Sequence, residues 1–184
     1  MAEDVDILLI RQIARGECAA EHALYQRHIR YLTAVVARYI SNDEDLRDVL
    51  QEALVKIFAN LSSFQYRGAG SLRAWMSRIV LNDTLRFLRD NSRLQFVELD
   101  HEATHIADPP PEAESVPADV IHRLIRELPD GYRTIFNLYL IENKSHKEIA
   151  KLLGIKESTS ASQFHRAKAA LAEKITNYLQ HNRL

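Results

Sequence analysis

Hydrophobic residues recur every three or four positions along most of the chain, and strictly alternating runs are almost absent. The first spacing lines one face of an α-helix, whereas alternation lines one face of a β-strand. The pattern predicts helices over about residues 4–15, 19–39, 46–61 and 72–89, and further helices from residue 120 onward. We therefore predict an all-α protein.

The helix over residues 46–61 has the clearest apolar stripe. Ser41 and Glu44 precede it with the spacing of a capping box, which marks a helix start. The stripe comprises Leu46, Val49, Leu50, Ala53, Leu54, Ile57, Phe58 and Leu61. The other face carries Asp45, Asp48, Gln51, Glu52 and Lys56. From the residues alone, this charged face fits a solvated surface as well as a partner-binding surface.

The loop over residues 62–71, SSFQYRGAGS, differs from the rest of the chain. Phe64, Tyr66 and Arg67 are followed by Gly68 and Gly70. The loop leads into an arginine-rich helix, whose predicted inner residues are Trp75, Met76, Ile79 and Val80. Exposed aromatic rings beside arginines suit single-stranded DNA, because bases stack on the rings while arginines bind phosphates. Burial of both aromatics in the core explains the pattern equally well.

Residues 145–168, SHKEIAKLLGIKESTSASQFHRAK, have the pattern of a helix-turn-helix, whose second helix usually enters the DNA major groove. Ser145 and Glu148 form a second capping-box spacing, and Gly154 stands where the turn needs positive φ. Ser158 or Thr159 is predicted to cap the second helix.

Two faces are predicted for that second helix. The inner face comprises Phe164, Ala167, Leu171 and Ile175, and the outer face Ser162, His165, Arg166 and Lys168. A helical hairpin with a solvated basic face is the alternative.

Residues 96–119 separate the two helical segments. This stretch contains four of the five prolines and shows no sustained periodicity, which predicts an extended linker. Residues 1–95 carry a net charge of +1, residues 96–119 of −7 and residues 120–184 of +5, so the overall −1 hides a strongly acidic middle. His101 and His105 lie in this stretch, where a solvated linker is favoured over a metal site.

The composition predicts a reducing, cytoplasmic setting. Cys18 is the only cysteine, so it forms no internal disulfide, and its helical context favours a packing role over a nucleophilic one. No apolar run is long enough to span a bilayer, and an acidic start, MAEDVD, does not suit a secretory signal. We expect no direct membrane insertion.

Three segments in this order resemble the extracytoplasmic-function (ECF) class of bacterial RNA polymerase sigma factors. DVLQEALVKIF (residues 48–58) is similar to the polymerase-binding helix of that class, and SFQYRGAGSLRAWMSRIVLN (residues 63–82) resembles its promoter-melting segment. Residues 128–171 are similar to its C-terminal, helix-turn-helix domain. The resemblance implies region 2 over residues 1–95, an acidic linker over 96–119, and region 4 over 120–184.

The resemblance also implies roles for individual residues. Those matching the polymerase-docking positions are Asp48, Gln51, Glu52 and Lys56. Those matching the positions that capture or guide the start-proximal promoter DNA are Phe64, Tyr66, Arg67, Gly68, Arg78, Ile79, Asn82 and Arg86. Those matching recognition-helix positions for the upstream promoter element are Ser160, Ser162, His165, Arg166 and Lys168. Many members have a glycine in place of Ser158 and basic residues in place of Ala161 and Gln163, so upstream recognition is expected to differ.

The implied partners are core RNA polymerase, promoter DNA as duplex and as single non-template strand, and an anti-sigma factor. No cofactor, metal or catalytic residue is predicted. A helix-turn-helix regulator that is not a polymerase subunit is the alternative function, but it leaves the 64–82 segment without a purpose. A small helical enzyme finds no support, since neither a phosphate-binding loop nor a nucleophile–base pair is evident.

Overall fold

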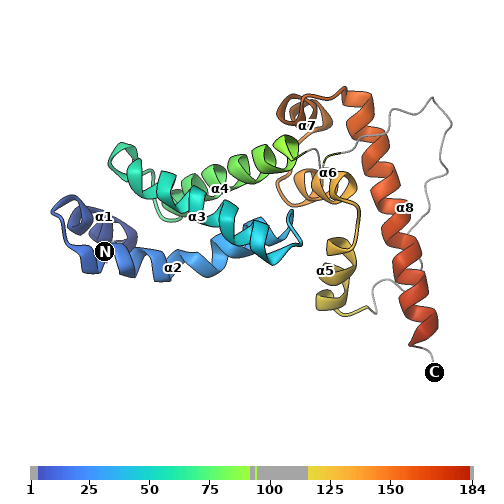
Figure 1. Ribbon diagram of the computed structural model, residues 1–184, viewed down its shortest axis with the longest axis horizontal. Helices are drawn as coiled ribbons and strands as arrows, with labels where there is room; N and C mark the ends of the chain where they lie inside the picture. The colour runs from blue at the N-terminus through green and yellow to red at the C-terminus, as the bar shows by residue number, and fades with distance from the viewer. Residues whose placement is uncertain (1–3, 92–93, 95–115, 183–184) are drawn as a thin grey trace. The chain divides into compact units, whose positions relative to one another are not determined.

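The computed structural model describes residues 4–91, 94 and 116–182. These residues form eight α-helices and one short 3-10 helix, and they contain no β-strand (Figure 1). The chain divides into two compact units, Met1–Phe87 and Leu88–Leu184. The prediction of an all-α protein is confirmed for the described part.

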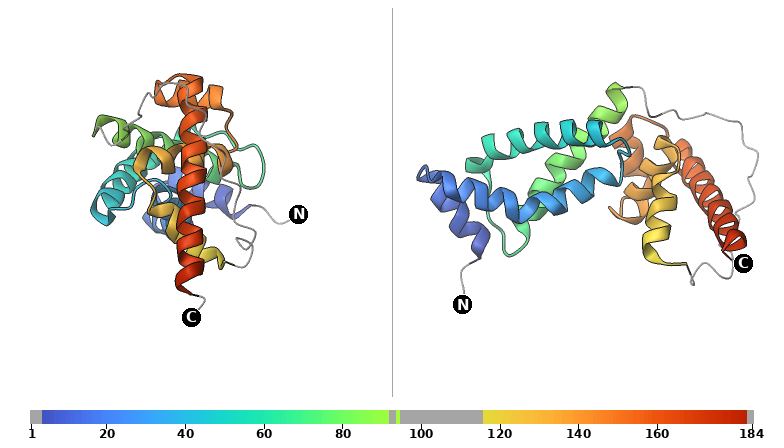
Figure 2. Two further views of the ribbon diagram at one scale, coloured as in Figure 1. Left: turned by 90° about the vertical axis from the view of Figure 1, so that its right-hand side faces the viewer. Right: turned by 60° about the horizontal axis from the view of Figure 1, so that its bottom comes forward.

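Unit 1 is built from α1 to α3 and from α4 up to Phe87. The bounds are α1 Val5–Ala14, α2 Cys18–Ala37, α3 Asp43–Ala59, the 3-10 helix η1 Leu61–Ser63, and α4 Ser71–Asp90. Helix α2 packs against both α1 and α3, and η1 contacts α1 and α3. The views in Figures 1 and 2 agree that α1 folds back along the first half of α2. The core side chains of α2 and α3 follow the predicted stripes, although Ile29, Leu54 and Phe58 are only half-buried.

Helix α1 is joined to α2 by a buried polar cluster. Asp6 is 5 % exposed, and its Oδ1 accepts from Arg27 Nε at 2.7 Å and lies 3.0 Å from His28 Nε2. His28 itself is 2 % exposed. Because a buried carboxylate without partners is costly, these bonds fix the place of α1 on α2. Cys18 begins α2 and is exposed, so its predicted packing role is wrong.

The start of α3 lies one residue away from the predicted cap. Asn42, rather than Ser41, is the N-cap, and its Oδ1 accepts from the backbone N–H groups of Glu44 and Asp45 at 2.9 and 3.0 Å. Asn and Ser are both good N-caps, so local propensity could not choose between the neighbours. The acidic first turn of α3 also suits the positive end of the helix dipole.

Unit 2 consists of three short helices and one long one. The bounds are α5 Ala118–Arg126, α6 Asp130–Leu140, α7 His146–Leu153 and α8 Glu157–His181. Helices α5, α6 and α7 all pack against α8, and Figure 1 shows them along one side of it. The predicted inner face of α8 is confirmed, since Phe164, Ala167, Leu171 and Ile175 are buried.

Arg133 is a buried side chain that the sequence did not single out. It is 2 % exposed on α6 and donates to the carbonyl oxygens of Arg126 at 2.7 Å and Leu128 at 2.9 Å, and to Asp130. Burial lowers the pKa of the guanidinium below its ordinary value, while Asp130 acts in the opposite direction. Arg133 therefore supplies donors to the end of α5 and to the turn that leads into α6.

The predicted linker ends earlier than residue 119. Val116 is buried and α5 already begins at Ala118, so the last residues of the 96–119 stretch belong to unit 2. Residues 95–115, including His101 and His105, lie outside the described part of the chain.

Candidate nucleic-acid interface

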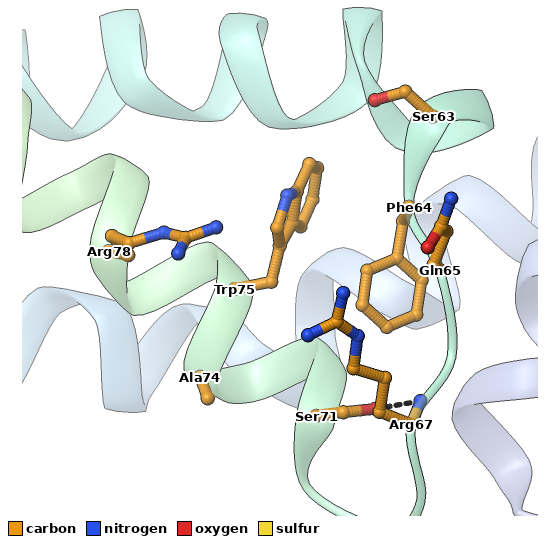
Figure 3. Close-up of a pocket in the computed structure, with 8 residues that line it drawn as sticks. All are labelled: Ser63, Phe64, Gln65, Arg67, Ser71, Ala74, Trp75 and Arg78. Carbon is orange, nitrogen blue, oxygen red and sulfur yellow. Dashed lines mark hydrogen bonds between the residues drawn. The ribbon is translucent and has the colours of Figure 1, made fainter.

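A pocket of about 440 Å³ opens beside the loop that precedes α4 (Figure 3). Its lining residues are Ser63, Phe64, Gln65, Arg67, Ser71, Ala74, Trp75 and Arg78. The rings of Phe64 and Trp75 have centroids 5.5 Å apart and are tilted by 51°. In Figure 3, Arg78 extends from α4 on the Trp75 side and Arg67 from the loop on the Phe64 side. Two aromatic faces flanked by two cations form a site for a flat, anion-bearing ligand.

The structure excludes full burial of the two loop aromatics, since Phe64 is half-buried and Tyr66 is exposed. Phe64 and Trp75 are half-buried, and both line the pocket. The prediction that Trp75 lies inside the core is therefore only half right. Gln65 and Ser71 also line the pocket, and nothing in their spacing had marked them out.

Tyr66 lies elsewhere. The residue is 41 % exposed, it does not line the pocket, and its hydroxyl donates to Asp4 Oδ2 at 3.0 Å. Gly68 and Gly70 shape the loop that follows, with φ of +111° and +82°. Side-chain-bearing residues rarely adopt these angles, so the loop conformation depends on glycine at both positions. Arg67 donates its backbone N–H to Ser71 Oγ at 3.2 Å, which closes the loop on the start of α4.

An exposed polar stripe continues from the pocket along α4. Arg78, Asn82 and Arg86 are exposed and are four residues apart, which places them on one helical face. Ile79 is half-buried beside them. The stripe thus pairs two guanidinium groups with one amide, and amides can bond base edges as well as backbone.

The charged face of α3 is exposed as the sequence suggested. Asp48, Gln51 and Glu52 are all exposed. Val55 lies seven residues after Asp48 and therefore shares this helical face. It is 65 % exposed, the largest value among the exposed large hydrophobic residues of the described part. Single exposed apolar residues are common on protein surfaces, but Val55 gives this polar face the kind of apolar position that the buried part of a protein interface contains. Sequence reasoning missed Val55, although its position seven residues after Asp48 was a usable signal.

Lys56 of α3 and Arg86 of α4 both lie beside Asp83, which was not among the predicted site residues. Asp83 is held by Lys56 Nζ at 2.7 Å, while Arg86 lies 3.9 Å from Asp83 and 3.7 Å from Glu52. The Asp83 side chain is only 12 % exposed, whereas those of Lys56 and Arg86 are 38 % and 50 % exposed. In this structure Lys56 therefore ties α3 to α4, and Arg86 remains more accessible.

The helix-turn-helix geometry of unit 2 is confirmed at its first helix. Ser145 Oγ accepts from Glu148 N, and the Glu148 carboxylate accepts from Ser145 N at 2.8 Å, which completes the capping box. These hydrogen bonds lower the pKa of Glu148. Gly154 ends α7 with φ of +69°, as predicted. The second helix, α8, begins at Glu157 after Lys156 without a side-chain cap, so the predicted cap at Ser158 or Thr159 is wrong.

The outer face of α8 is smaller than predicted. Ser162 and His165 are exposed, and Arg166 and Lys168 are half-buried. Ser160 is fully buried, and its hydroxyl lies 3.0 Å from His146 Nδ1, so its predicted place among the DNA-facing residues is wrong.

Two of the three expected departures remain on the surface. Ser158 is exposed and Ala161 is half-buried, but Gln163 is fully buried. Many members of the class that the sequence resembles carry a basic residue where this chain has Gln163. Because residue 163 is buried here, the lack of a cation at this position does not change the outer face of α8.

His146 joins the three helices of this motif. Its ring stacks on Tyr139 of α6 at 4.6 Å between centroids and lies 5.8 Å from Phe164 of α8. Burial, and then the neighbouring His165, lower the pKa of His146 below 6.5, although Glu157 acts in the opposite direction. The folded motif therefore favours the neutral form of the His146 ring.

No group of three or more His, Cys, Asp and Glu side chains is arranged to hold a metal ion among the described residues. None of the helices in the described ranges is long and apolar enough to cross a membrane.

Family comparisons match both units. The family model described as Sigma-70 region 2 matches residues 24–94, and the one described as Sigma-70, region 4 matches residues 118–171. Together they cover more than half of the chain.

Similar proteins span nearly the whole chain. The ECF RNA polymerase sigma-E factor of Haemophilus influenzae is 27% identical over 95% of this chain and 98% of its own length. The RNA polymerase sigma-H factor of Pseudomonas aeruginosa is 25% identical, with 98% of both chains covered, and the ECF RNA polymerase sigma-E factor of Escherichia coli K12 is 26% identical over 92% of this chain and 94% of its own. The solved structure of CnrH in complex with the cytosolic domain of CnrY aligns with 95% of this chain and 99% of that chain, at 25% identity and a TM-score of 0.48.

Proposed function

The chain belongs to the sigma-70 family as an ECF RNA polymerase sigma factor, and on that premise we propose how its two units divide the work of transcription initiation. Unit 1 docks on core polymerase and opens the start-proximal promoter element. Unit 2 binds the upstream element. The observation that carries the proposal is the pocket that Phe64 and Trp75 line together with Arg67 and Arg78.

The docking surface is the exposed face of α3. Asp48, Gln51 and Glu52 supply polar complementarity, and Val55 supplies the apolar centre that a protein interface needs. Lys56 supports this face by pairing with Asp83.

The pocket receives one base turned out of the duplex. Extraction of a base costs a few kcal/mol of stacking and pairing, and stacking of the base on an open face of Phe64 or Trp75 offsets part of that cost. Arg67 and Arg78 then neutralise neighbouring phosphates. Beyond the pocket, Asn82 and Arg86 continue the stripe along which the non-template strand runs, with Ile79 as an apolar contact. Gly68 contributes through the shape of the loop.

The upstream element is contacted by α8. Ser162 and His165 offer hydrogen-bonding groups to base edges, while Arg166 and Lys168 reach bases or phosphates from the side of the helix. Because only a few cations lie on this face, we propose that unit 2 binds DNA weakly by itself and acts mainly within the holoenzyme.

Sigma factors are initiation factors, and we assign this one no catalytic step of its own. It works in the cytoplasm, where its polymerase partner is. An anti-sigma factor that covers the α3 face would keep it inactive, since that face carries both the charged stripe and Val55. Residues 96–115, which carry six acidic and no basic side chains, would follow a positively charged path on polymerase.

The test is transcription in vitro from fragments of the host genome, with core polymerase and the full chain. We expect initiation at defined promoters that core polymerase alone does not use. If no promoter is used while the chain alone binds duplex DNA tightly, the sigma function is wrong.

Two variants then separate the surfaces. Asn82→Ala should reduce open-complex formation, read by reactivity of unpaired thymines, without changing affinity for core polymerase. Glu52→Lys should reduce the affinity for core polymerase directly. Arg15→Ala, an exposed arginine outside α4 and the loop, serves as the matched control and should change neither.

A further inference from the structure

The N-terminal helix α1 contacts the loop that forms the pocket. Asp4 uses its two carboxylate oxygens for different tasks: Oδ1 caps α1 by accepting from Asp6 N at 3.1 Å, and Oδ2 accepts from the Tyr66 hydroxyl at 3.0 Å. The second bond joins residues that are 62 positions apart. Helix α1 also packs against η1, which leads directly into the loop. None of α1 lies within the residues matched by the region 2 family model.

Helix α1 is itself firmly placed. The buried Asp6 cluster with Arg27 and His28 holds it on α2, which belongs to the core of unit 1. Asp4 is therefore presented from an anchored helix, two residues before that cluster. A bond from an anchored helix can restrain a loop, because the partner does not move with the loop.

The loop needs such a restraint. Gly68 and Gly70 both have positive φ, and glycine loses more conformational freedom on ordering than any other residue. Tyr66 lies between the pocket residues Gln65 and Arg67, so fixing its hydroxyl fixes the backbone on which both are carried. Partial loss of hydration, followed by the bond to Asp4 and its charge, raises the pKa of Tyr66 above its ordinary 10.0. The phenol is protonated at neutral pH in either case and can donate to Asp4.

We propose that Asp4 and Tyr66 form a clasp between α1 and the 64–70 loop that preorganises the pocket for the flipped promoter base. Tyr66 acts by holding Asp4 and not by touching DNA, and Asp4 is a positioning residue. The inference rests on the proposed function of the pocket, and it adds α1 to the elements that determine promoter melting.

The chain offers variants that separate the clasp from the cap. Asp4→Ser retains an N-cap hydroxyl, but this side chain is one bond shorter and cannot reach Tyr66 while it caps. Asp4→Asn keeps the cap oxygen and offers its amide N–H to the Tyr66 oxygen, so it should rescue. Tyr66→Phe keeps the ring and removes only the hydroxyl donor.

The assay measures binding of the reconstituted holoenzyme to forked promoter DNA from a promoter mapped by the transcription experiment above. The single-stranded non-template strand carries either its natural bases or one abasic site, placed at each position in turn. The ratio of the two dissociation constants at the most sensitive position measures base capture. Asp4→Ser and Tyr66→Phe should each reduce that ratio by about three- to tenfold, the range of one exposed hydrogen bond, and the double variant should lose no more than either. Asp4→Asn should resemble the wild type, and affinity for core polymerase should not change.

Three results would overturn the clasp. One is a normal ratio in Asp4→Ser, and another is an equal loss of affinity for intact and abasic DNA, which would reduce α1 to a support of the fold. The third is a loss in Tyr66→Phe alone, which would make the Tyr66 hydroxyl a direct DNA contact. A wild-type ratio of one at every position would instead remove base capture by the pocket, and the clasp with it.

Discussion

Replacement of Arg133 by methionine tests whether one buried guanidinium holds unit 2 together. Methionine keeps a long apolar side chain but removes all the donors to the Arg126 and Leu128 carbonyls and to Asp130. The bond to Leu128 is buried, so its carbonyl would stay unsatisfied at a cost of about 1–3 kcal/mol. The other two acceptors are partly exposed and can turn to water, which adds about 1 kcal/mol. We expect unit 2 to lose about 2–4 kcal/mol of unfolding free energy.

The chain contains its own reporter for this experiment. Trp75 is the only tryptophan and belongs to unit 1, so its fluorescence follows unit 1 through a urea titration, whereas far-ultraviolet circular dichroism follows both units. In Arg133→Met, part of the dichroism transition should move to lower urea while the fluorescence transition stays. Arg123→Met, an exposed arginine on α5, is the matched control and should change stability by less than about 0.5 kcal/mol. The reasoning is refuted if Arg133→Met behaves like the control, or if the tryptophan transition moves with it.

Three further outcomes are expected. Val55→Asp should weaken binding to core polymerase by more than tenfold, measured by competition, because a charge replaces the apolar centre of the α3 face; an affinity within twofold of wild type would contradict that role. Since the pKa of His146 is lowered in the folded state, the unfolded state binds the proton more tightly, so unit 2 should be fully stable above pH 6.5 and lose stability as the pH falls below it; His146→Gln should flatten this dependence in urea titrations, and an unchanged slope would argue against it. Gly154→Ala should destabilise unit 2 by about 1 kcal/mol, since a Cβ there meets no neighbour within 4 Å and only the φ of +69° opposes it; a neutral result would mean that the turn relaxes.

Local sequence predicted the features that depend on neighbours within four residues. The capping box of Ser145 and Glu148 and the left-handed turn at Gly154 are of this kind, because both partners lie within one helical turn. The buried stripe of α8 also followed from spacing alone. Ser41 and Asn42 are adjacent and equally suited to cap α3, so local propensity does not distinguish between them.

Site residues were predicted less evenly than helices. The resemblance to sigma factors pointed to surfaces on α3 and α4, and most of the residues it named there are exposed, while their roles remain predictions. It did not mark Asp83, Gln65 or Ser71, whose roles come from contacts across elements. The resemblance also placed Ser160 on the DNA side, whereas the structure buries it.

The sequence by itself thus determined the helices, their inner faces and the family, since each depends on periodicity or short-range spacing. Only the tertiary structure decided that Ser160 turns inward to His146, that Tyr66 turns away from the pocket to Asp4, and that Arg133 is buried among carbonyls. The physical reason is the same in each case. A polar side chain has many possible partners in a chain of this length, and the fold selects the one that removes it from water without leaving it unpaired.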